Sequence, residues 1–131
     1  MIFVDTGAWF ALLVGDDPNY SVAQQWFARN RSSLVTTDYV VDELLTLVRS
    51  RVDTRMSIRV GESVLDEQLA DLIQIDHEDF VAAWNVFARY RDKEWSFTDC
   101  VSLVVMRRLK INTAFAFDEH FRQFGTVNVV P

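Results

Sequence analysis

The hydrophobic positions along the chain fall into short continuous runs that alternate with longer stretches of helical spacing. Short apolar runs are typical of strands buried on both faces of a sheet, whereas apolar residues three and four apart mark one face of a helix. We expect strands at residues 2–4, 34–36, 72–75, 113–117 and 127–129. We expect helices at residues 7–13, after the turn at residues 16–19, and at residues 38–51, 57–67, 76–87, 96–110 and 119–123.

This alternation predicts the fold class. Strands that alternate with helices pair in parallel, because the helix between them returns the chain to the same edge of the sheet. A chain of 131 residues suits one domain with its own core rather than two. We therefore expect an α/β fold over residues 1–131, a three-layer α/β/α sandwich with a central, mostly parallel sheet. Trp9, Trp26 and Trp84 fall within helical apolar patterns and are expected in its core.

Composition narrows the class of protein further. Half of the residues are hydrophobic, which argues against disorder, and charges interrupt the apolar runs well short of a membrane span. No basic segment precedes the first apolar run, which argues against a secretory signal. The single cysteine, Cys100, cannot form an internal disulfide and fits a reducing compartment. We therefore expect a soluble protein of the cytoplasm without membrane association.

Carboxylates follow the first and fourth predicted strands. Asp5 comes directly after residues 2–4, and Asp118 comes directly after residues 113–117. The carboxyl ends of parallel strands meet at one edge of the sheet, which is where open α/β sheets bind ligands. Each residue could instead cap the helix that follows it, because Asp is a favoured N-cap. The two residues taken singly leave both readings open.

Two further acids lie on predicted helices. Helical spacing places Glu43 at the border of a buried stripe, one turn from Leu47, whereas Asp42 points toward water. Asp99 completes a capping box with Ser96 and also opens a helix that is apolar almost all round. A partly buried carboxylate needs a partner, because an unpaired buried charge is costly. That partner is either a basic side chain or a metal ion.

Together the four acids form a candidate site for a hard cation. Carboxylate oxygens are the ligands that Mg²⁺ or Mn²⁺ prefers, whereas the two histidines and the cysteine lack the spacing of a zinc site. One or two such ions would activate a water molecule and stabilise charge on a phosphodiester as it is cleaved. With the four acids set aside, the net charge of −6 becomes −2, so the charge does not exclude a phosphate-bearing substrate. Hydroxyls that could support the ion or act as helix caps come from Thr6, Ser96 and Thr98.

At these segments the chain resembles PIN-domain ribonucleases. The similar segments are Val4-Asp5-Thr6, Val41-Asp42-Glu43-Leu44, Ser96-Phe97-Thr98-Asp99 and Phe117-Asp118-Glu119-His120-Phe121, which occur in the family's order along essentially the whole chain. The compact length and the Asp16-Asp17-Pro18 turn are similar in particular to VapC-type toxins of toxin–antitoxin pairs. The resemblance implies a Mg²⁺- or Mn²⁺-dependent endoribonuclease that a cognate antitoxin holds inactive. Its catalytic and metal-binding acids would be Asp5, Glu43, Asp99 and Asp118, whereas Gly7 departs from the hydroxyl residue of many relatives.

Arginines supply the candidate contacts to an RNA backbone. Arg51, Arg55 and Arg59 are spaced four apart, with Arg49 nearby, and would form one ridge if their helix were continuous. Their charges could equally be the solvated end of a helix, where cations favour the helix dipole.

Two other residues near the acids are candidates for the substrate side of the site. Trp95 lies four residues before Asp99, beside a charged loop, and is the one tryptophan expected to touch substrate. His120 follows Asp118 by two residues and could carry a proton near neutral pH. Exposed apolar positions on the early helices could serve a homodimer or an antitoxin.

Other classes of acidic α/β protein fit this sequence less well. A phosphoacceptor receiver domain requires paired acids near the first strand and a Lys after a late one, and this chain has neither. A haloacid-dehalogenase-type phosphatase requires an acid two residues after the first, where this chain has Gly7. The remaining alternative is a catalytically silent PIN-like module that acts through partner binding, and the four intact acids favour the nuclease over it.

Overall fold

A five-stranded parallel sheet lies at the centre of the computed structural model, which describes residues 1–131. Its strands are β1 (Ile2–Val4), β2 (Leu34–Thr37), β3 (Asp71–Ile73), β4 (Thr113–Phe115) and β5 (Asn128–Val130), in the order β3-β2-β1-β4-β5. Every neighbouring pair is parallel, so the expected fold class is confirmed and the sheet is parallel throughout.

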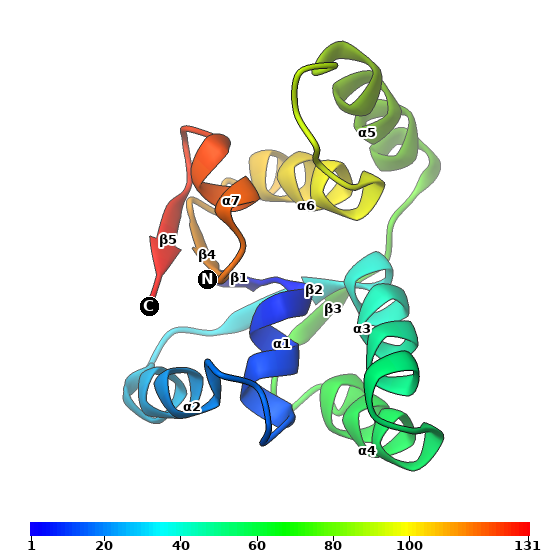
Figure 1. The fold of residues 1–131 in the computed structure, drawn as a ribbon. Coiled ribbons are helices and arrows are strands. Elements are labelled where there is room, and N and C mark those ends of the chain that lie inside the picture. The colour runs from blue at the N-terminus through cyan, green and yellow to red at the C-terminus, as the bar shows by residue number, and fades with distance from the viewer.

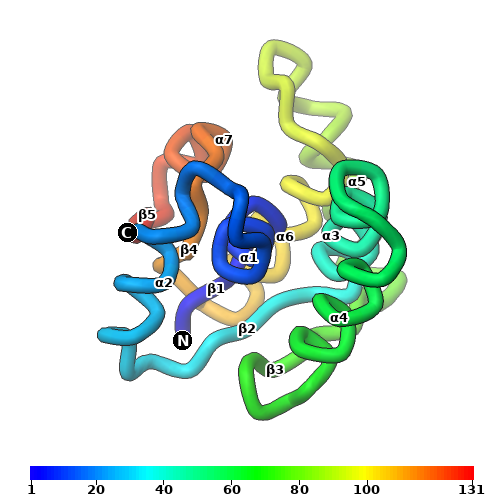
Figure 2. The backbone as a smooth tube through the Cα atoms, turned by 60° about the horizontal axis from the view of Figure 1, so that its bottom comes forward, coloured from blue at the N-terminus to red at the C-terminus, as the bar shows by residue number.

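Seven helices cover this sheet. They are α1 (Thr6–Leu13), α2 (Tyr20–Arg29), α3 (Asp38–Arg51), α4 (Thr54–Leu65), α5 (His77–Arg89), α6 (Phe97–Arg108) and α7 (Glu119–Gln123). In Figure 1, α5, α6 and α7 lie above the sheet, whereas α1, α2 and the α3–α4 hairpin lie below it and to its right. Figure 2 shows α1 end-on near the middle of the molecule, beside β1. None of the helices is long and apolar enough to cross a membrane.

The core lies where the central strands meet the inner faces of the helices. Phe3 and Val4 of β1 and Phe115 of β4 have no exposed surface, because these strands have neighbours on both sides and helices above and below. Trp9 of α1 is also fully buried, and its indole N–H donates to the Thr36 hydroxyl at 3.2 Å. This bond ties the first helix to β2 and fixes the start of α1 over the end of the sheet.

The expectation that Trp84 belongs to the core is wrong. The Trp84 side chain is 55% exposed, and those of Phe80, Val81 and Phe87 are exposed as well. The helix that carries them, α5, packs chiefly against α6 and lies at the periphery of the molecule (Figure 1). Helical spacing identifies an apolar stripe, but it does not tell how many neighbours the helix has, and α5 has more apolar surface than α6 covers.

Candidate acidic active site

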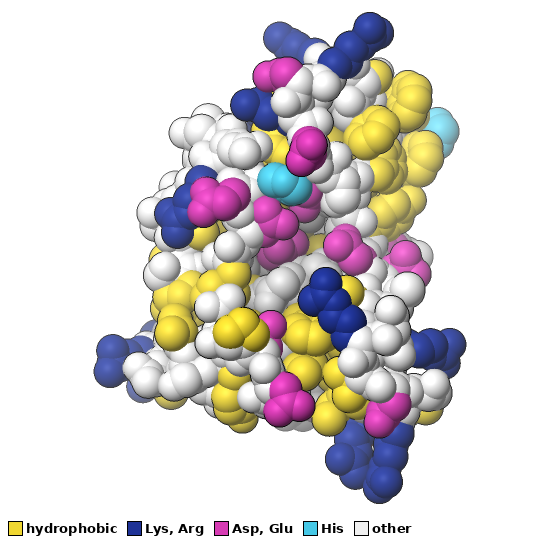
Figure 3. Space-filling model, in the orientation of Figure 1, with side chains coloured by type: hydrophobic (Ala, Val, Ile, Leu, Met, Phe, Trp, Pro, Cys, Tyr) yellow, Lys and Arg dark blue, Asp and Glu magenta, His cyan; other side chains and the backbone are white.

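The four predicted acids line one cleft, although they come from distant parts of the chain. Asp5 follows β1, Glu43 lies on α3, Asp99 lies on α6 and Asp118 precedes α7. The cleft has a volume of about 310 Å³. In Figure 3, acidic side chains gather around a histidine in the hollow at the middle of the face that is shown. The parallel pairing of β1 with β4 brings Asp5 and Asp118 to the same edge of the sheet, as the strand order requires.

Asp5 is the most deeply buried of these acids, with 4% of its surface exposed. It occupies the N-cap position of α1, yet its side chain makes no capping hydrogen bond, so capping does not account for it. Burial, followed by the nearby charge of Asp99, raises the pKa of Asp5 from 3.8 to about 8. A cation in the cleft would stabilise the charged form of this buried carboxylate.

Asp99 forms the predicted capping box, and its carboxylate also lines the cleft. Its backbone N–H donates to the Ser96 hydroxyl and its carboxylate accepts from the Ser96 N–H, each at 3.0 Å, which completes the predicted capping box. The same carboxylate oxygen lies 2.8 Å from His120 Nδ1, and Asp118 Oδ1 lies 3.5 Å from that nitrogen. Burial by itself would lower the pKa of His120, but hydrogen bonding to Asp99 and the charge of Asp118 shift it upward overall.

Glu43 and Asp118 form the outer, exposed side of the cleft. Glu43 has no basic side chain within ion-pair distance, so the salt-bridge explanation for it does not hold. Partial burial raises the pKa of Glu43; the hydroxyl of Thr98 offsets part of this shift, and the charge of Asp99 adds to it. Asp118 caps α7 by accepting from the His120 N–H at 2.9 Å, which confirms the cap reading while leaving its second oxygen to the cleft.

The three predicted hydroxyl residues differ in how they are used. The Ser96 hydroxyl is occupied as the cap of α6, and the Thr98 hydroxyl lies beside Glu43. Thr6 lines the cleft at the start of α1, and its hydroxyl is the one buried side-chain polar atom in the protein without a hydrogen-bond partner. Buried polar groups are nearly always paired, so an orphan hydroxyl beside four acids indicates that a polar species belongs in this cleft.

The donor set fits a divalent cation better than it fits any other group. All of its ligands are hard oxygens, and Asp5 and Glu43 both have raised pKa values that a cation would reverse. As the side chains stand, no group of three or more His, Cys, Asp or Glu residues is placed to hold a metal ion. Coordination would therefore require the carboxylates to turn inward from the walls of the cleft, which the exposed Glu43 and Asp118 have room to do.

The arginines do not form the ridge that an uninterrupted helix would give. Helix α3 ends at Arg51, and Asp53 caps α4 by accepting from the Met56 N–H at 2.7 Å. Arg51 itself lines the cleft, with its guanidinium 5.7 Å from the centre of the Phe10 ring.

The other three arginines lie away from the acids. Arg55 and Arg59 are on α4, and Arg49 faces a groove between α3 and α4. None of these three lines the acidic cleft, and their contact with RNA stays a prediction.

Trp95 lies in the interior rather than on a loop surface, and this corrects the expectation from its charged neighbours. It is 7% exposed, and its indole N–H donates to Gln123 Oε1 at 3.0 Å. The charged residues before Trp95 favoured a surface position, whereas its ring packs inward against Phe124. Its neighbour Glu94 lines the acidic cleft as a fifth carboxylate. This residue was not predicted, because the segment has no helical or strand periodicity that would indicate where its side chain points.

Comparisons with known proteins agree with this geometry. The model of the PIN domain family matches residues 2–127. The chain is 31% identical to the 23S rRNA-specific endonuclease VapC20 of Mycobacterium tuberculosis, in strains CDC 1551 / Oshkosh and H37Rv alike, over 100% of this chain and 99% of the relative. The crystal structure of Mycobacterium tuberculosis VapC20, a sarcin-ricin loop cleaving toxin, matches with a TM-score of 0.93 and 30% identity over 100% of both chains.

A more distant structure shares the fold alone. FitAcB from Neisseria gonorrhoeae matches with a TM-score of 0.71 and 17% identity, over 100% of this chain and 97% of the other. The family model covers nearly every residue, and the similarity to VapC20 extends from one end of the chain to the other. This chain therefore belongs to the PIN-domain family.

Proposed function

We propose that this protein is a metal-dependent endoribonuclease of the VapC type, the toxin of a toxin–antitoxin pair. The cleft in which four acids from four separate elements meet carries the proposal. Full-length similarity to VapC20, an endonuclease specific for 23S rRNA, supports RNA as the substrate and makes 23S rRNA the first RNA to test. A protein of this class acts in the cytoplasm, where its one cysteine stays reduced.

The residues of the cleft would have different roles in hydrolysis. Asp5, Glu43, Asp99 and Asp118 would hold Mg²⁺ or Mn²⁺, which supplies positive charge to a phosphodiester during cleavage when it is bound. Arg51 lines the same cleft and can orient a phosphate. Asp99 engages Nδ1 of His120, which leaves the Nε2 atom of that ring to hold or release a proton.

The proposed partners are a cognate antitoxin and a second copy of the chain. A groove of about 660 Å³ between α3 and α4 is lined by Leu45, Ile58 and Leu65, of which Ile58 and Leu65 are exposed. An amphipathic helix of an antitoxin would bury these side chains. We include a homodimer in the proposal because apolar side chains of an early helix, Tyr20 and Val22 of α2, are also exposed.

The first test measures cleavage of purified 23S rRNA by the wild type and by Asp5→Asn, each with Mg²⁺, with Mn²⁺ and with EDTA. We expect site-specific cleavage by the wild type with either metal, and none with EDTA or with the variant. Calorimetric titration with Mn²⁺ should show weaker binding by Asp5→Asn. Cleavage that persists in EDTA would remove the metal from the proposal, and a protein without nuclease activity that still binds an antitoxin would be the silent PIN-like module.

A matched pair of neighbouring acids tests the geometry of α3. Glu43 lines the cleft, whereas Asp42 is exposed elsewhere on the same helix. We expect Glu43→Gln to lower the cleavage rate by about a hundredfold, as is typical when one charge-stabilising group of an active site is removed. Asp42→Asn changes charge by the same amount and should cleave at the wild-type rate. Equal losses in the two variants would show that overall charge, and not the cleft, is responsible.

A further inference from the structure

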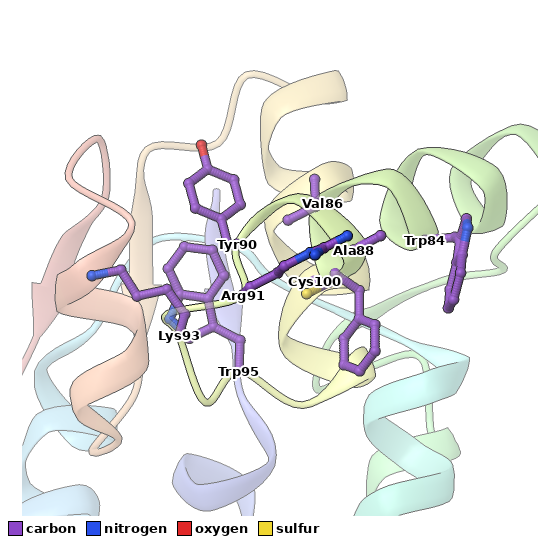
Figure 4. Close-up of a pocket in the computed structure, with 9 residues that line it drawn as sticks. Trp84, Val86, Ala88, Tyr90, Arg91, Lys93, Trp95 and Cys100 are labelled. Atoms are coloured by element: carbon purple, nitrogen blue, oxygen red, sulfur yellow. The ribbon is translucent and has the colours of Figure 1, made fainter.

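A second cavity lies beside the acidic cleft and has a different chemical character. It has a volume of about 470 Å³, within the range of small-ligand sites. Four aromatic rings and two cations line it, namely Trp84, Phe87, Tyr90, Trp95, Arg91 and Lys93. Figure 4 shows these side chains around the junction of α5, α6 and the loop at residues 90–96.

One backbone segment separates this cavity from the acidic cleft. Residues 93–96 have no helical structure, and their side chains alternate between the two sides. Lys93 and Trp95 line the aromatic cavity, whereas Glu94 and Ser96 line the acidic cleft. Alternation of this kind is what an extended chain produces, because successive side chains point in opposite directions. The two sites therefore share a wall whose thickness is on the order of 10 Å, one chain with its side chains.

The rings form a fixed inner wall and an exposed outer wall. Trp95 is held by its bond to Gln123 and packs against Tyr90, with ring centres 5.0 Å apart. On the other side, Trp84 and Phe87 stack at 6.0 Å, and both are largely exposed, with Phe87 at 43%. Exposed aromatic rings of this kind are the surfaces on which unpaired bases of RNA stack.

The cations distinguish this cavity from an ordinary apolar surface. In Figure 4 the Arg91 side chain extends across the cavity toward Ala88 and Trp84, while the Lys93 side chain points outward from it. Arg91 has no carboxylate within ion-pair distance, and Lys93 has only its neighbour Asp92 at 3.9 Å. A guanidinium beside aromatic rings suits a planar base and its phosphate.

We propose that this cavity binds the nucleobase of an unpaired RNA nucleotide next to the phosphate that is cleaved. The inference rests on the proposed ribonuclease function, and it adds a binding position for the base beside the cleaved phosphate. The base would lie against Trp84 and Phe87, with Arg91 and Lys93 near its phosphate and the adjoining phosphate across the wall in the acidic cleft. A protein partner would instead require the whole outer face of α5, including Phe80, which does not line the cavity.

The test measures RNA binding by fluorescence anisotropy in the presence of EDTA. The two ligands are a short fluorescein-labelled single-stranded RNA of mixed sequence and the same RNA in a duplex. We expect Trp84→Ala to weaken binding of the single strand by about tenfold, the usual effect of removing one stacking ring, and to leave duplex binding unchanged. Arg91→Gln should weaken the single strand as well. Phe80→Ala removes an exposed ring of the same helix outside the cavity and should bind like the wild type.

Two results would overturn the proposal. One is equal binding of single-stranded RNA by the wild type, Trp84→Ala and Arg91→Gln, all folded as judged by circular dichroism. The other is loss of a dimer in sedimentation for both Trp84→Ala and Phe80→Ala with RNA binding intact, which would assign the face to a second copy of the chain. The cleavage assay with 23S rRNA is separate: cleavage without a Trp84 effect refutes only the base pocket, and a Trp84 effect without cleavage refutes only the nuclease.

Discussion

The carboxylate of Asp5 shows how one side chain links the stability of the protein to its proposed chemistry. It lies at the end of the central strand, almost without contact with water, and other acids border the same cleft. Its charged form is disfavoured by burial first and by Asp99 second. A site that is unfavourable when empty and favourable when a cation is present couples metal binding to folding.

This coupling predicts an unusual pH dependence in the absence of metal. The pKa of Asp5 is about 8 in the folded protein and 3.8 ordinarily, so the folded state binds more protons between these values. The free energy of unfolding should therefore fall as pH rises from about 4 to about 8, the reverse of a salt-bridged acid. Urea unfolding in EDTA across this range measures it.

Asp5→Asn provides the control, because it removes the charge without changing the shape of the side chain. The variant should be more stable than the wild type near pH 8 in EDTA, and Mn²⁺ should stabilise it less than it stabilises the wild type. Identical unfolding of the two proteins at every pH would show that the charge of Asp5 is compensated within the chain.

The sequence predicted the residues of the site better than their contacts. Asp5 and Asp118 follow from strand ends, and Glu43 follows from helical phase, because these are local patterns. The orphan hydroxyl of Thr6 and the bond from His120 to Asp99 depend on packing between segments far apart in the chain, which local pattern does not contain.

A partly buried ion pair joins α5 to α6. Asp79 in its first turn is 3% exposed, and both of its oxygens accept from Arg108 at the end of α6, each at 2.8 Å. The bidentate pair therefore adds a charge-assisted contact to the extensive packing between the two helices.

Removing the exposed partner of this pair, Arg108, should destabilise the protein. Arg108→Leu leaves the Asp79 carboxylate buried without a partner, and we expect a loss of about 2 kcal/mol in the free energy of unfolding. Arg107→Leu removes the neighbouring cation, which makes no ion pair, and should change stability by less than about 0.5 kcal/mol. Chemical denaturation of both variants decides the matter, and similar losses would assign the effect to helix charge rather than to the pair.

The starts of most helices could be predicted from the sequence, because a capping side chain precedes them, and the start of α4 is the exception. Thr37, Asp53, Asp76 and Ser96 each accept a hydrogen bond from the third residue of the helix that follows, a contact whose spacing is visible in sequence. The start of α4 at Thr54 was placed three residues late, because apolar periodicity is clear only from Ser57 onward. The peripheral position of α5 could not be predicted, because the number of neighbours of a helix depends on tertiary packing and not on local sequence.

For the molecule as a whole, the question is how an acidic chain holds a polyanion. Seen in Figure 3, carboxylates occupy the hollow of this face. The cations that border the two cavities are Arg51, Arg91 and Lys93. With so few positive contacts, affinity for RNA would have to come largely from stacking and from a metal ion rather than from a basic surface.

This balance predicts a shallow dependence of RNA binding on salt. Each phosphate contact to a single strand contributes about −0.7 to the slope of log K against log salt concentration, so three cations give a slope of about −2 in EDTA. Arg51→Gln should reduce its magnitude by about 0.7. Arg31 lies shortly before β2, at the opposite edge of the sheet from the acids, so Arg31→Gln should leave the slope unchanged. A slope several times steeper, or an equal change in both variants, would mean that RNA binds a basic surface elsewhere and that the shared wall between the two cavities does not position it.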